Sequence, residues 1–392
     1  MDGRKLIQLE DYDISPSMGF LLERPLLRLP EYFSPWEKVC DDIPQMIKDG
    51  MNARDIMEKL PLLDHSLLSS KEEWYRANLL LITMAHTFVW CQGENEAAKV
   101  LPKNIAVPMF SVARHLDMHP VLTHFSQTNC NWRKIGPNES DIELINTITG
   151  TKTEQGFFKT GFLVELAFGK GGPKALIKAQ QAAFDDDVLQ LIDAMKVIHH
   201  VIENMKSAFL KVHEMCDPKE YYFVLRPFLS GWGHKGSSLP DGLIYEGVDT
   251  KPKKYSGGSA AQCSAFPAIE AILGVTHATE NGEEHHLQKM RRYMPPKHRD
   301  FITVLENGPS VREYVLKKEN QDLTEIFNQS VEALQEFRNA HMRVVARYII
   351  SQANRSKEAM GKNAFGSYGT AGADLFSFFK KIRNETAETK LN

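Results

Sequence analysis

The chain has 392 residues, of which 42% are hydrophobic and 25% charged, and its 47 basic and 50 acidic side chains leave a formal net charge of −3. These values are typical of a globular protein and exclude a disordered chain or a protein built mainly of membrane-spanning segments. No long basic stripe is present that could neutralise a row of phosphates, so we expect no nucleic-acid partner.

The cysteines and the apolar runs indicate a cytoplasmic protein. The five cysteines are scattered along the chain, at Cys40, Cys91, Cys130, Cys216 and Cys263. An odd, dispersed set is poor material for a disulfide framework, and it fits a reducing compartment. Residues 1–13 lack the basic head and apolar stretch of a secretory signal. The longest apolar run, residues 78–90, is too short to cross a bilayer, which needs about 20 residues, so we expect no membrane association.

The first part of the chain is predicted to be a small helical domain. Prolines interrupt residues 1–65, which predicts short helices joined by turns. Two serines before Lys71 can cap a helix whose apolar run extends to Trp90, so we expect that helix to be buried on most sides. Turn formers around residues 136–140 place a domain junction after the helix. We therefore predict a small domain over 1–115, a linker over 116–140 and a large domain over 141–392.

The rest of the chain is dominated by helical periodicity. Residues 174–215 contain hardly a helix breaker, and their apolar residues recur at three and four positions, which predicts one long amphipathic helix. Residues 321–350 repeat this pattern. Strand patterns are scarce, with one short strand possible within 242–248. The polar, glycine-rich residues 351–372 predict a mobile loop, after which a final helix begins at Asp374. The predicted fold is all-α.

His341 lies on the second of these long helices, in the segment FRNAHMRVVARYI. It continues an apolar stripe that includes Val331 and Leu334, so it should face the interior. A histidine in that setting is, in most proteins, a core residue with satisfied hydrogen bonds. A haem ligand needs the same setting, because a neutral imidazole on a rigid helix presents one nitrogen to iron while apolar walls exclude water. The pattern permits a haem ligand without requiring one.

A second group of residues follows the helix start predicted at residues 217–220, which offers an N-cap, a first-turn proline and an N3 glutamate. Tyr222 and Arg226 share a helix face, and Pro227 should end or kink the helix at the arginine. A guanidinium in that position could bind a carboxylate in bidentate fashion, and the rings of Tyr221 and Tyr222 could hold a flat apolar ligand. An ordinary surface or interdomain salt bridge is the alternative.

Small residues fill the segment YSGGSAAQ, residues 255–262, where the backbone can approach a flat group and offer N–H and hydroxyl donors. The G-x-S-x-A spacing at 257–261 resembles a hydrolase nucleophile elbow, but a basic segment precedes it instead of an apolar strand. Residues 366–372 are also glycine-rich, without the Gly-Lys-Ser/Thr ending of a phosphate-binding loop. His115 and His119 have a zinc-ligand spacing, but a proline ends any helix there and no third ligand is evident.

Six segments carry a resemblance to a known family. They are PLLDHS (61–66), DGLIYEGV (241–248), GGSAAQ (257–262), MRRYMPPKHRDF (290–301), PSVREYVL (309–316) and FRNAH (337–341). Their sequence, order and spacing resemble the indoleamine 2,3-dioxygenase family, from near residue 15 to the final helix. The chain looks most similar to invertebrate members, a group that resembles both dioxygenases and the dioxygenase-like myoglobins of molluscs.

The resemblance implies a small helical N-terminal domain that caps a large helical domain holding haem b, with His341 as the iron ligand. The implied activity is insertion of dioxygen across the indole C2–C3 bond of L-tryptophan, or of another indoleamine, giving N-formylkynurenine at the head of the kynurenine pathway. An electron donor would reduce the ferric iron. One alternative is an oxygen-binding protein of myoglobin type with little turnover, and another is a haem-binding signalling or scaffold protein.

The resemblance also implies a set of site residues. Arg226 would bind the substrate carboxylate, and Thr370 in the predicted loop would help to close the site. Glu270 would be an acidic residue near the iron-binding histidine, where a carboxylate strengthens an imidazole ligand. The other residues implied to bind substrate are Tyr221, Tyr222, Phe157, Gly161, His124 and Ser259. The residues implied to border the haem, besides His341 and Glu270, are Gly258, Ser259 and Ala260.

Two of these positions depart from the pattern of the family. Gly161 stands where many members carry a serine, so the hydroxyl of that serine is missing. His124 replaces a tyrosine of the pocket. Both changes alter the polarity or the room of the pocket, so we expect the chain to bind tryptophan weakly compared with better-known members.

Overall fold

The computed structural model of the chain describes residues 7–234, 237–278, 284–360, 369–370, 372 and 374–391. Across these residues helices dominate, and the strands form two pairs of two residues each. The fold is therefore all-α, as the sequence predicted. In this part of the chain no helix is both long and apolar enough to span a membrane.

Helices separated by turns make up the N-terminal part, as its prolines predicted. They are η1 (Leu9–Tyr12), η2 (Glu31–Phe33), α1 (Ser34–Lys48), α2 (Ala53–Met57), η3 (His65–Leu67), α3 (Lys71–Trp90), η4 (Glu94–Glu96) and α4 (Lys103–His115). The predicted cap of α3 is confirmed, because the Oγ of Ser70 accepts a hydrogen bond of 3.2 Å from the N–H of Glu73. Every residue of α3 from Arg76 to Trp90 is buried.

The middle of the chain contains several helices instead of the one predicted over residues 174–215. They are η5 (Phe125–Asn129), α5 (Lys152–Gly169), α6 (Gly172–Phe184), α7 (Val188–Leu210), α8 (Val212–Met215), α9 (Pro218–Glu220), η6 (Tyr221–Leu225) and α10 (Arg226–Leu229). The prediction of a single helix is wrong because three consecutive aspartates separate α6 from α7. Asp186 has a left-handed backbone with φ of 61°, and the Oδ1 of Asp187 caps α7 by accepting from the N–H of Gln190 at 2.9 Å.

The remaining helices lie in the second half. They are η7 (Ala260–Gln262), α11 (Ala265–Leu273), α12 (His286–Arg291), α13 (Pro296–Glu306), α14 (Val311–Lys318), α15 (Gln321–Val345), η8 (Ala346–Ile350), α16 (Ser351–Met360) and α17 (Leu375–Ala387). The helix predicted over 321–350 is confirmed, and it continues to Met360. The loop predicted over 351–372 is therefore wrong for residues 351–360, and most of its remainder lies outside the described residues. The final helix begins after Asp374, as predicted.

Three of the helical segments are π turns, in which the hydrogen bonds span five residues instead of four. They are η5, η6 and η8. The turn η5 follows His124, η6 precedes Arg226, and η8 begins five residues after His341. Each π turn therefore lies within five residues of a residue that the sequence singled out.

The strands are short, at two residues each. Strand β1 (Val100–Leu101) pairs in parallel with β4 (Ile244–Tyr245), and β2 (Arg133–Lys134) pairs antiparallel with β3 (Ile142–Glu143). The short strand predicted within residues 242–248 is thus confirmed as β4. Through its pairing with β1, strand β4 joins the chain that leads into residues 255–262 to the N-terminal part of the protein.

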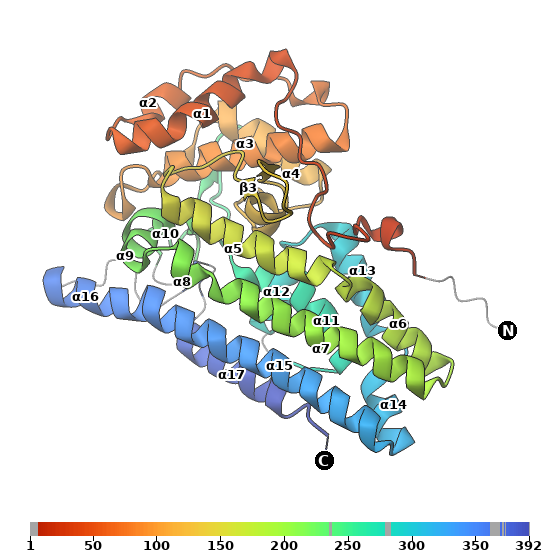
Figure 1. The fold of residues 1–392 in the computed structure, drawn as a ribbon. Helices are drawn as coiled ribbons and strands as arrows, with labels where there is room; N and C mark the ends of the chain where they lie inside the picture. The colour runs from red at the N-terminus through yellow and green to blue at the C-terminus, as the bar shows by residue number, and fades with distance from the viewer. Residues whose placement is uncertain are drawn as a thin grey trace.

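The helices are arranged in two layers (Figure 1). Helix α7 lies between α5 and α15, and α17 packs on the other side of α15. These helices belong to one layer. Helices α1 to α4, drawn in red and orange, form the second layer, and α3 of this layer contacts α10. Buried apolar residues form two large clusters. One extends from α1–α4 to the end of α15, and the other joins α5–α7 with α11 and α13–α15.

The first described residues pack with the later helices and not with α1–α4. Leu9, Ile14 and Phe20 belong to the second cluster, and the ring of Phe20 stacks on that of Phe168 in α5 with centroids 5.4 Å apart. The division into domains at 1–115, 116–140 and 141–392 stays a prediction.

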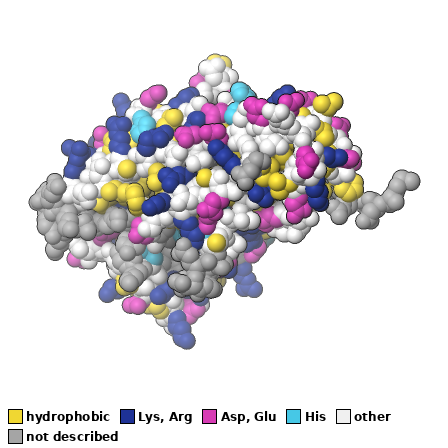
Figure 2. Space-filling view, turned by 90° about the horizontal axis from the view of Figure 1, so that it is seen from below, with side chains coloured by type: hydrophobic (Ala, Val, Ile, Leu, Met, Phe, Trp, Pro, Cys, Tyr) yellow, Lys and Arg dark blue, Asp and Glu magenta, His cyan; other side chains and the backbone are white. Residues whose placement is uncertain are grey.

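The surface drawn in Figure 2 carries both signs of charge. Basic and acidic side chains are interspersed on this face, with apolar patches between them. Opposite charges that alternate at short range largely cancel at a distance. This face therefore presents no field of a single sign.

A buried ion pair connects α1 to α3. The two side chains of Glu37 and Arg76 are 6% and 3% exposed. The Nε of Arg76 donates to the Oε1 of Glu37 at 3.0 Å, and its Nη atoms donate to the second oxygen and to Asn146. The backbone N–H of Leu29 also donates to Glu37 at 2.9 Å. Both charges are thus fully paired, which is the condition under which a buried ion pair is tolerated.

We predict that Glu37→Gln lowers the free energy of unfolding by about 3 kcal/mol, because it leaves the buried guanidinium of Arg76 without a charged partner. Urea unfolding followed by circular dichroism measures this change. The matched control is Asp41→Asn, which removes the exposed partner of Arg28 and should cost less than about 1 kcal/mol. Equal losses in the two variants would contradict the prediction.

Candidate functional site

A cavity of about 560 Å³ lies where the two apolar clusters meet. Its volume is within the range of about 300–1,000 Å³ in which small ligands and cofactors bind. Most of the residues singled out in the sequence lie in its wall, namely His124, Phe157, Gly161, Tyr221, Gly258, Ser259, Ala260, Glu270, His341 and Thr370. Tyr222 and Arg226 are not in the wall.

His341 presents its imidazole to this cavity from α15. The ring packs against Phe379 and Phe209, with centroid distances of 4.4 Å and 5.0 Å. It forms no hydrogen bond with any residue that the structure describes. Burial lowers the pKa of His341 to about 4, so the imidazole is neutral near pH 7. A neutral imidazole without a hydrogen-bond partner is available as a ligand of a metal ion.

His86 shows what a structural histidine looks like in the same protein. The backbone N–H of Leu122 donates to its Nε2 at 2.9 Å, so the hydrogen of the ring must be on Nδ1, which donates to the carbonyl of Phe228 at 2.8 Å. Burial lowers the pKa of His86 to about 4 as well. Both nitrogens of His86 are therefore satisfied, in contrast to those of His341, and its role is to join α3 to the cavity wall.

Glu270 lies on the same side of the cavity as part of an ionic network. Its carboxylate bonds the guanidinium of Arg338, which precedes His341 by one helical turn, and its second oxygen lies 3.4 Å from the Nε2 of His277. Burial would raise the pKa of Glu270, but Arg338 and His277 lower it to about 2. The Nδ1 of His277 also lies 2.5 Å from Glu385 on α17. Glu270 thus connects α11 to α15 through Arg338 and forms no direct hydrogen bond with His341.

The glycine-rich segment forms another part of the wall. A Cβ at Gly257 would lie 2.2 Å from the carbonyl oxygen of Leu229, and one at Gly258 would lie 2.4 Å from the side chain of Leu122. Only glycine fits at position 257, where the close atoms are backbone, whereas at position 258 the Leu122 side chain would have to move. Thr370 packs on the segment, since its Oγ1 donates to the carbonyl of Gly258 at 2.5 Å.

Gln262 holds this segment in place. Its Oε1 accepts from the backbone N–H of His124 at 2.9 Å, and its Nε2 donates to the carbonyl of Gly257 at 2.9 Å. The Oγ of Ser259 accepts from the N–H of Ala261 at 3.2 Å and caps η7. Ser259 is therefore a helix cap, and the described residues around it contain no strand such as a nucleophile elbow requires.

Aromatic rings form the side of the cavity that is nearest to Arg226. The rings of Phe157 and Tyr221 are tilted against each other with centroids 4.9 Å apart. The guanidinium carbon of Arg226 lies 5.2 Å from the centroid of the Tyr222 ring, and both residues are buried. Burial lowers the pKa of Arg226, and burial raises the pKa of Glu94 to about 7 against the opposing effect of Arg226.

Pro227 was expected to end or kink the helix at Arg226, and the helix does not end there. The π turn η6 comes before the proline, and α10 continues for one more turn to Leu229. Arg226 is only 3% exposed, so it is not an ordinary surface residue.

The room left by Gly161 is taken by Thr128. A Cβ at position 161 would lie 3.0 Å from the Cγ2 and 3.2 Å from the Oγ1 of Thr128, which also lines the cavity. Thr128 on η5 therefore packs closely against Gly161 in this part of the wall. Spacing along the sequence could not indicate this, because the two residues are brought together only by the packing of η5 on α5.

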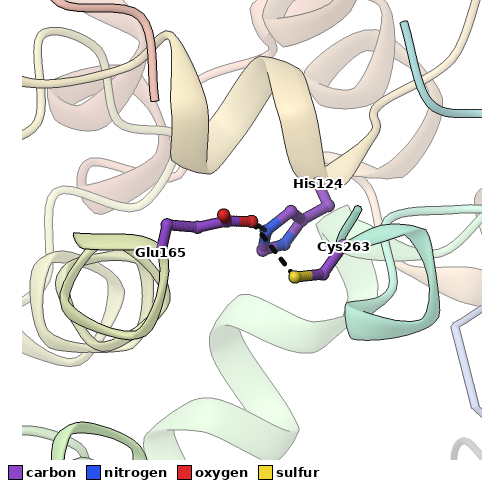
Figure 3. Close-up of side chains that lie close together, drawn as sticks. All are labelled: His124, Glu165 and Cys263. Atoms are coloured by element: carbon purple, nitrogen blue, oxygen red, sulfur yellow. Dashed lines mark hydrogen bonds and ion pairs between the residues drawn. The ribbon is translucent and has the colours of Figure 1, made fainter. Parts of the chain in front are cut away.

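His124 does not point freely into the cavity. Its Nε2 lies 2.8 Å from the Oε1 of Glu165 on α5, and the thiol of Cys263 donates to the same oxygen at 3.1 Å (Figure 3). Burial and the nearby Glu165 raise the pKa of the Cys263 thiol well above its usual value. Glu165, Cys263, Gln262 and Thr128 were not singled out in the sequence, because each acts through a contact with a distant segment.

His115 and His119, whose spacing resembles that of zinc ligands, belong to no group of metal-binding side chains among the described residues. Among the described residues, three metal-binding side chains come together only at His124, Glu165 and Cys263, and at His277, His285 and Glu385. The ring of His115 stacks on Trp74 with centroids 3.7 Å apart.

The cavity fits a flat, apolar, iron-containing cofactor. Its wall is mostly apolar, glycines let the backbone approach closely on one side, and His341 supplies an imidazole nitrogen that has no protein partner. These are the features by which haem is held in proteins.

Comparison with known proteins identifies relatives along almost the whole chain. A family model described as Indoleamine 2,3-dioxygenase matches residues 8–389. A Mus musculus protein named Indoleamine 2,3-dioxygenase 2 is 38% identical over 393 residues, which cover 98% of this chain and 96% of that protein. A Haliotis madaka protein named Myoglobin is 33% identical over 387 residues, which cover 98% of this chain and 99% of that protein. A Saccharomyces cerevisiae protein named Indoleamine 2,3-dioxygenase is 31% identical over 436 residues, which cover 98% of this chain and 94% of that protein.

We predict that His341→Ala abolishes the normal Soret band and most haem retention, because the variant removes the imidazole that α15 presents to the cavity. Added imidazole should restore the band by occupying the vacated place. The matched control is His200→Ala on the exposed face of α7, which should keep haem and spectrum unchanged. A His341→Ala protein with full haem and an unaltered Soret band would show that another residue binds the iron.

Proposed function

Because the chain belongs to the indoleamine 2,3-dioxygenase family, whose members are haem proteins, we propose that it is a haem-dependent enzyme that inserts dioxygen across the C2–C3 bond of the indole of L-tryptophan, giving N-formylkynurenine. Haem is the cofactor of the chain. The observation that carries the proposal is a single cavity whose wall contains both the imidazole of His341 and the aromatic pair Phe157 and Tyr221.

In this proposal the residues of the chain bind the haem and the substrate, orient the substrate, and exclude water. Bound haem supplies the iron at which dioxygen is activated. His341 is kept neutral by burial and would supply the imidazole nitrogen that holds the iron. The apolar wall keeps water away from the reacting atoms, and Phe157 and Tyr221 pack against the indole ring. The reaction adds both oxygen atoms to the substrate without a net transfer of protons, so no general base is required.

Arg226 is proposed to bind the substrate carboxylate. A guanidinium keeps its positive charge even when it is buried, and it binds a carboxylate through two parallel hydrogen bonds. In the structure Arg226 is 3% exposed and is not among the residues that line the cavity. The contact of Thr370 with Gly258 would then close the site over the bound amino acid.

An oxygen-binding protein of myoglobin type is the second candidate. It is favoured by the relatives from Haliotis named Myoglobin, which are 33% identical to almost the whole chain. The same cavity and the same histidine would serve reversible oxygen binding. The two candidates differ in whether tryptophan is converted.

We also propose that the protein works in the cytoplasm and receives electrons from a reductant that keeps its iron ferrous. All five cysteines are free thiols in the structure, and buried free thiols persist in a reducing compartment. The identity of the reductant would be sought among electron-transfer proteins of that compartment.

We predict that the reduced holoprotein converts L-tryptophan to N-formylkynurenine under air, and that Arg226→Ala lowers kcat/KM by roughly 100-fold, because a charge-assisted pair with the substrate is lost. The product is followed by its absorbance after reduction of the protein with ascorbate and methylene blue. The Soret band of Arg226→Ala should be normal, and Arg343→Ala, at an exposed position of α15, is the control. Reversible oxygen binding without product would favour the second candidate.

We predict a Michaelis constant for L-tryptophan well above the low micromolar range. Gly161 offers no hydroxyl, and His124 is bonded to Glu165 instead of being available to a ligand. Steady-state kinetics over a range of tryptophan concentrations measures the constant. A value in the low micromolar range would mean that these two positions do not limit affinity.

A further inference from the structure

We propose that His124, Glu165 and Cys263 form a second metal site, which binds one divalent cation of the kind that accepts nitrogen, oxygen and sulfur ligands, such as zinc. The site would be distinct from the haem iron and would lie in the wall of the same cavity. The inference does not depend on which ligand the cavity accepts.

Three separate segments of the chain bring the ligand atoms together (Figure 3). His124 precedes η5, Glu165 lies on α5, and Cys263 follows η7. The imidazole nitrogen, the carboxylate oxygen and the sulfur all lie within 4.8 Å of one another. The segments are held in this arrangement by independent contacts, since Gln262 fixes the backbone of His124 and η5 packs on α5. The cluster is thus preorganised by the fold.

One carboxylate oxygen of Glu165 has no hydrogen-bond partner among the described residues. Its side chain is fully buried, and both of its hydrogen bonds, from His124 and Cys263, reach the same oxygen, Oε1. The other oxygen, Oε2, is buried without a hydrogen-bond partner among the described residues. A buried carboxylate oxygen without a partner costs free energy, and a cation is one group that removes that cost.

The charges of the three ligands suit a divalent cation. One carboxylate, one thiolate and one neutral imidazole would bring the net charge of the site to zero, which is favourable in an apolar environment. The Cys263 thiol would lose its proton to solvent as the cation binds. Zinc binds nitrogen at about 2.0–2.1 Å and sulfur at about 2.3 Å, so the ligand atoms of a tetrahedral site are about 3.3–3.7 Å apart. The present contacts of 2.8 Å and 3.1 Å need to open by less than about 1 Å.

The proposed site has three protein ligands and an open fourth position. His124 and Cys263 line the cavity, whereas Glu165 lies behind them. A zinc ion with three protein ligands and an open position is the arrangement found in catalytic zinc sites, where water or a substrate atom completes the tetrahedron. The fourth ligand here would come from the cavity.

The other group of metal-binding side chains is less suited to a cation. Glu385 already bonds the Nδ1 of His277 and lies 3.9 Å from the Nζ of Lys381. Burial alone would lower the pKa of His277, but Glu270 and Glu385 raise it, so that His277 itself is the cation of this group.

Zinc added to the holoprotein tests the proposal. The protein is first treated with a chelator that leaves haem in place, then mixed with zinc and separated by gel filtration. We expect one retained zinc per chain by elemental analysis. X-ray absorption at the zinc edge, which does not detect the haem iron, should show one sulfur at about 2.3 Å with nitrogen or oxygen at about 2.0–2.1 Å. No retained zinc, or zinc without a sulfur neighbour, would overturn the proposal.

Three variants assign the ligands. Loss of a residue that only supports a metal ligand costs about 10- to 100-fold in affinity, so Cys263→Ser, Glu165→Gln and His124→Phe should each weaken zinc binding by at least about 100-fold. Cys91→Ser, a free thiol outside the cluster, is the control and should bind as the wild type does. Each variant is checked for a normal Soret band. If Cys263→Ser does not fold, Glu165→Gln decides, and wild-type affinity in a folded variant would overturn the proposal.

Discussion

An imidazole that lines a cavity, and that no group among the described residues satisfies, is the constraint on which the rest of the structure depends. An unpaired polar nitrogen in an apolar interior is unfavourable unless a ligand completes it. The fold nevertheless keeps His341 between Phe209 and Phe379 and provides a cavity beside it. The two apolar clusters therefore meet around a space that they do not fill. The contrast with His86, whose two nitrogens are both bonded, shows that the chain can satisfy a buried histidine where no ligand is required.

The fold could be predicted well where local chemistry decides it. The start of α3 depends on Ser70, and the start of α17 depends on Asp374, and both caps are readable from neighbouring residues. The break between α6 and α7 at residues 185–187 also had a local signal, because aspartates cap helices. This signal was overlooked because the apolar periodicity continues on both sides of it. The helix that continues from α15 through η8 and α16 to Met360 was missed, because a polar helix looks like a loop when only composition is considered. The division into domains stays a prediction.

The site could be predicted only in part. His341 and residues 258–260 were found because a resemblance of short segments marked them, and the structure places them in one wall. Glu165 could not be found in this way, because its contacts with His124 and Cys263 join segments far apart in the sequence. Thr128 packs against Gly161 although the two residues lie on different elements, which no local pattern records. Haem is the cofactor of the chain, whereas the role of each residue remains a proposal.

The three π turns have a consequence for how such a cavity changes during evolution. A π turn contains one residue more than an α turn, and one residue corresponds to a rotation of about 100° around a helix. Deletion of a single residue within η8 would convert it to ordinary α-helix and swing all of α16 around its axis relative to α15. The side of the helix that carries His341 would stay in place. Insertions and deletions of one residue can therefore redirect the helix that follows the cavity wall while the segment that carries His341 is inherited unchanged.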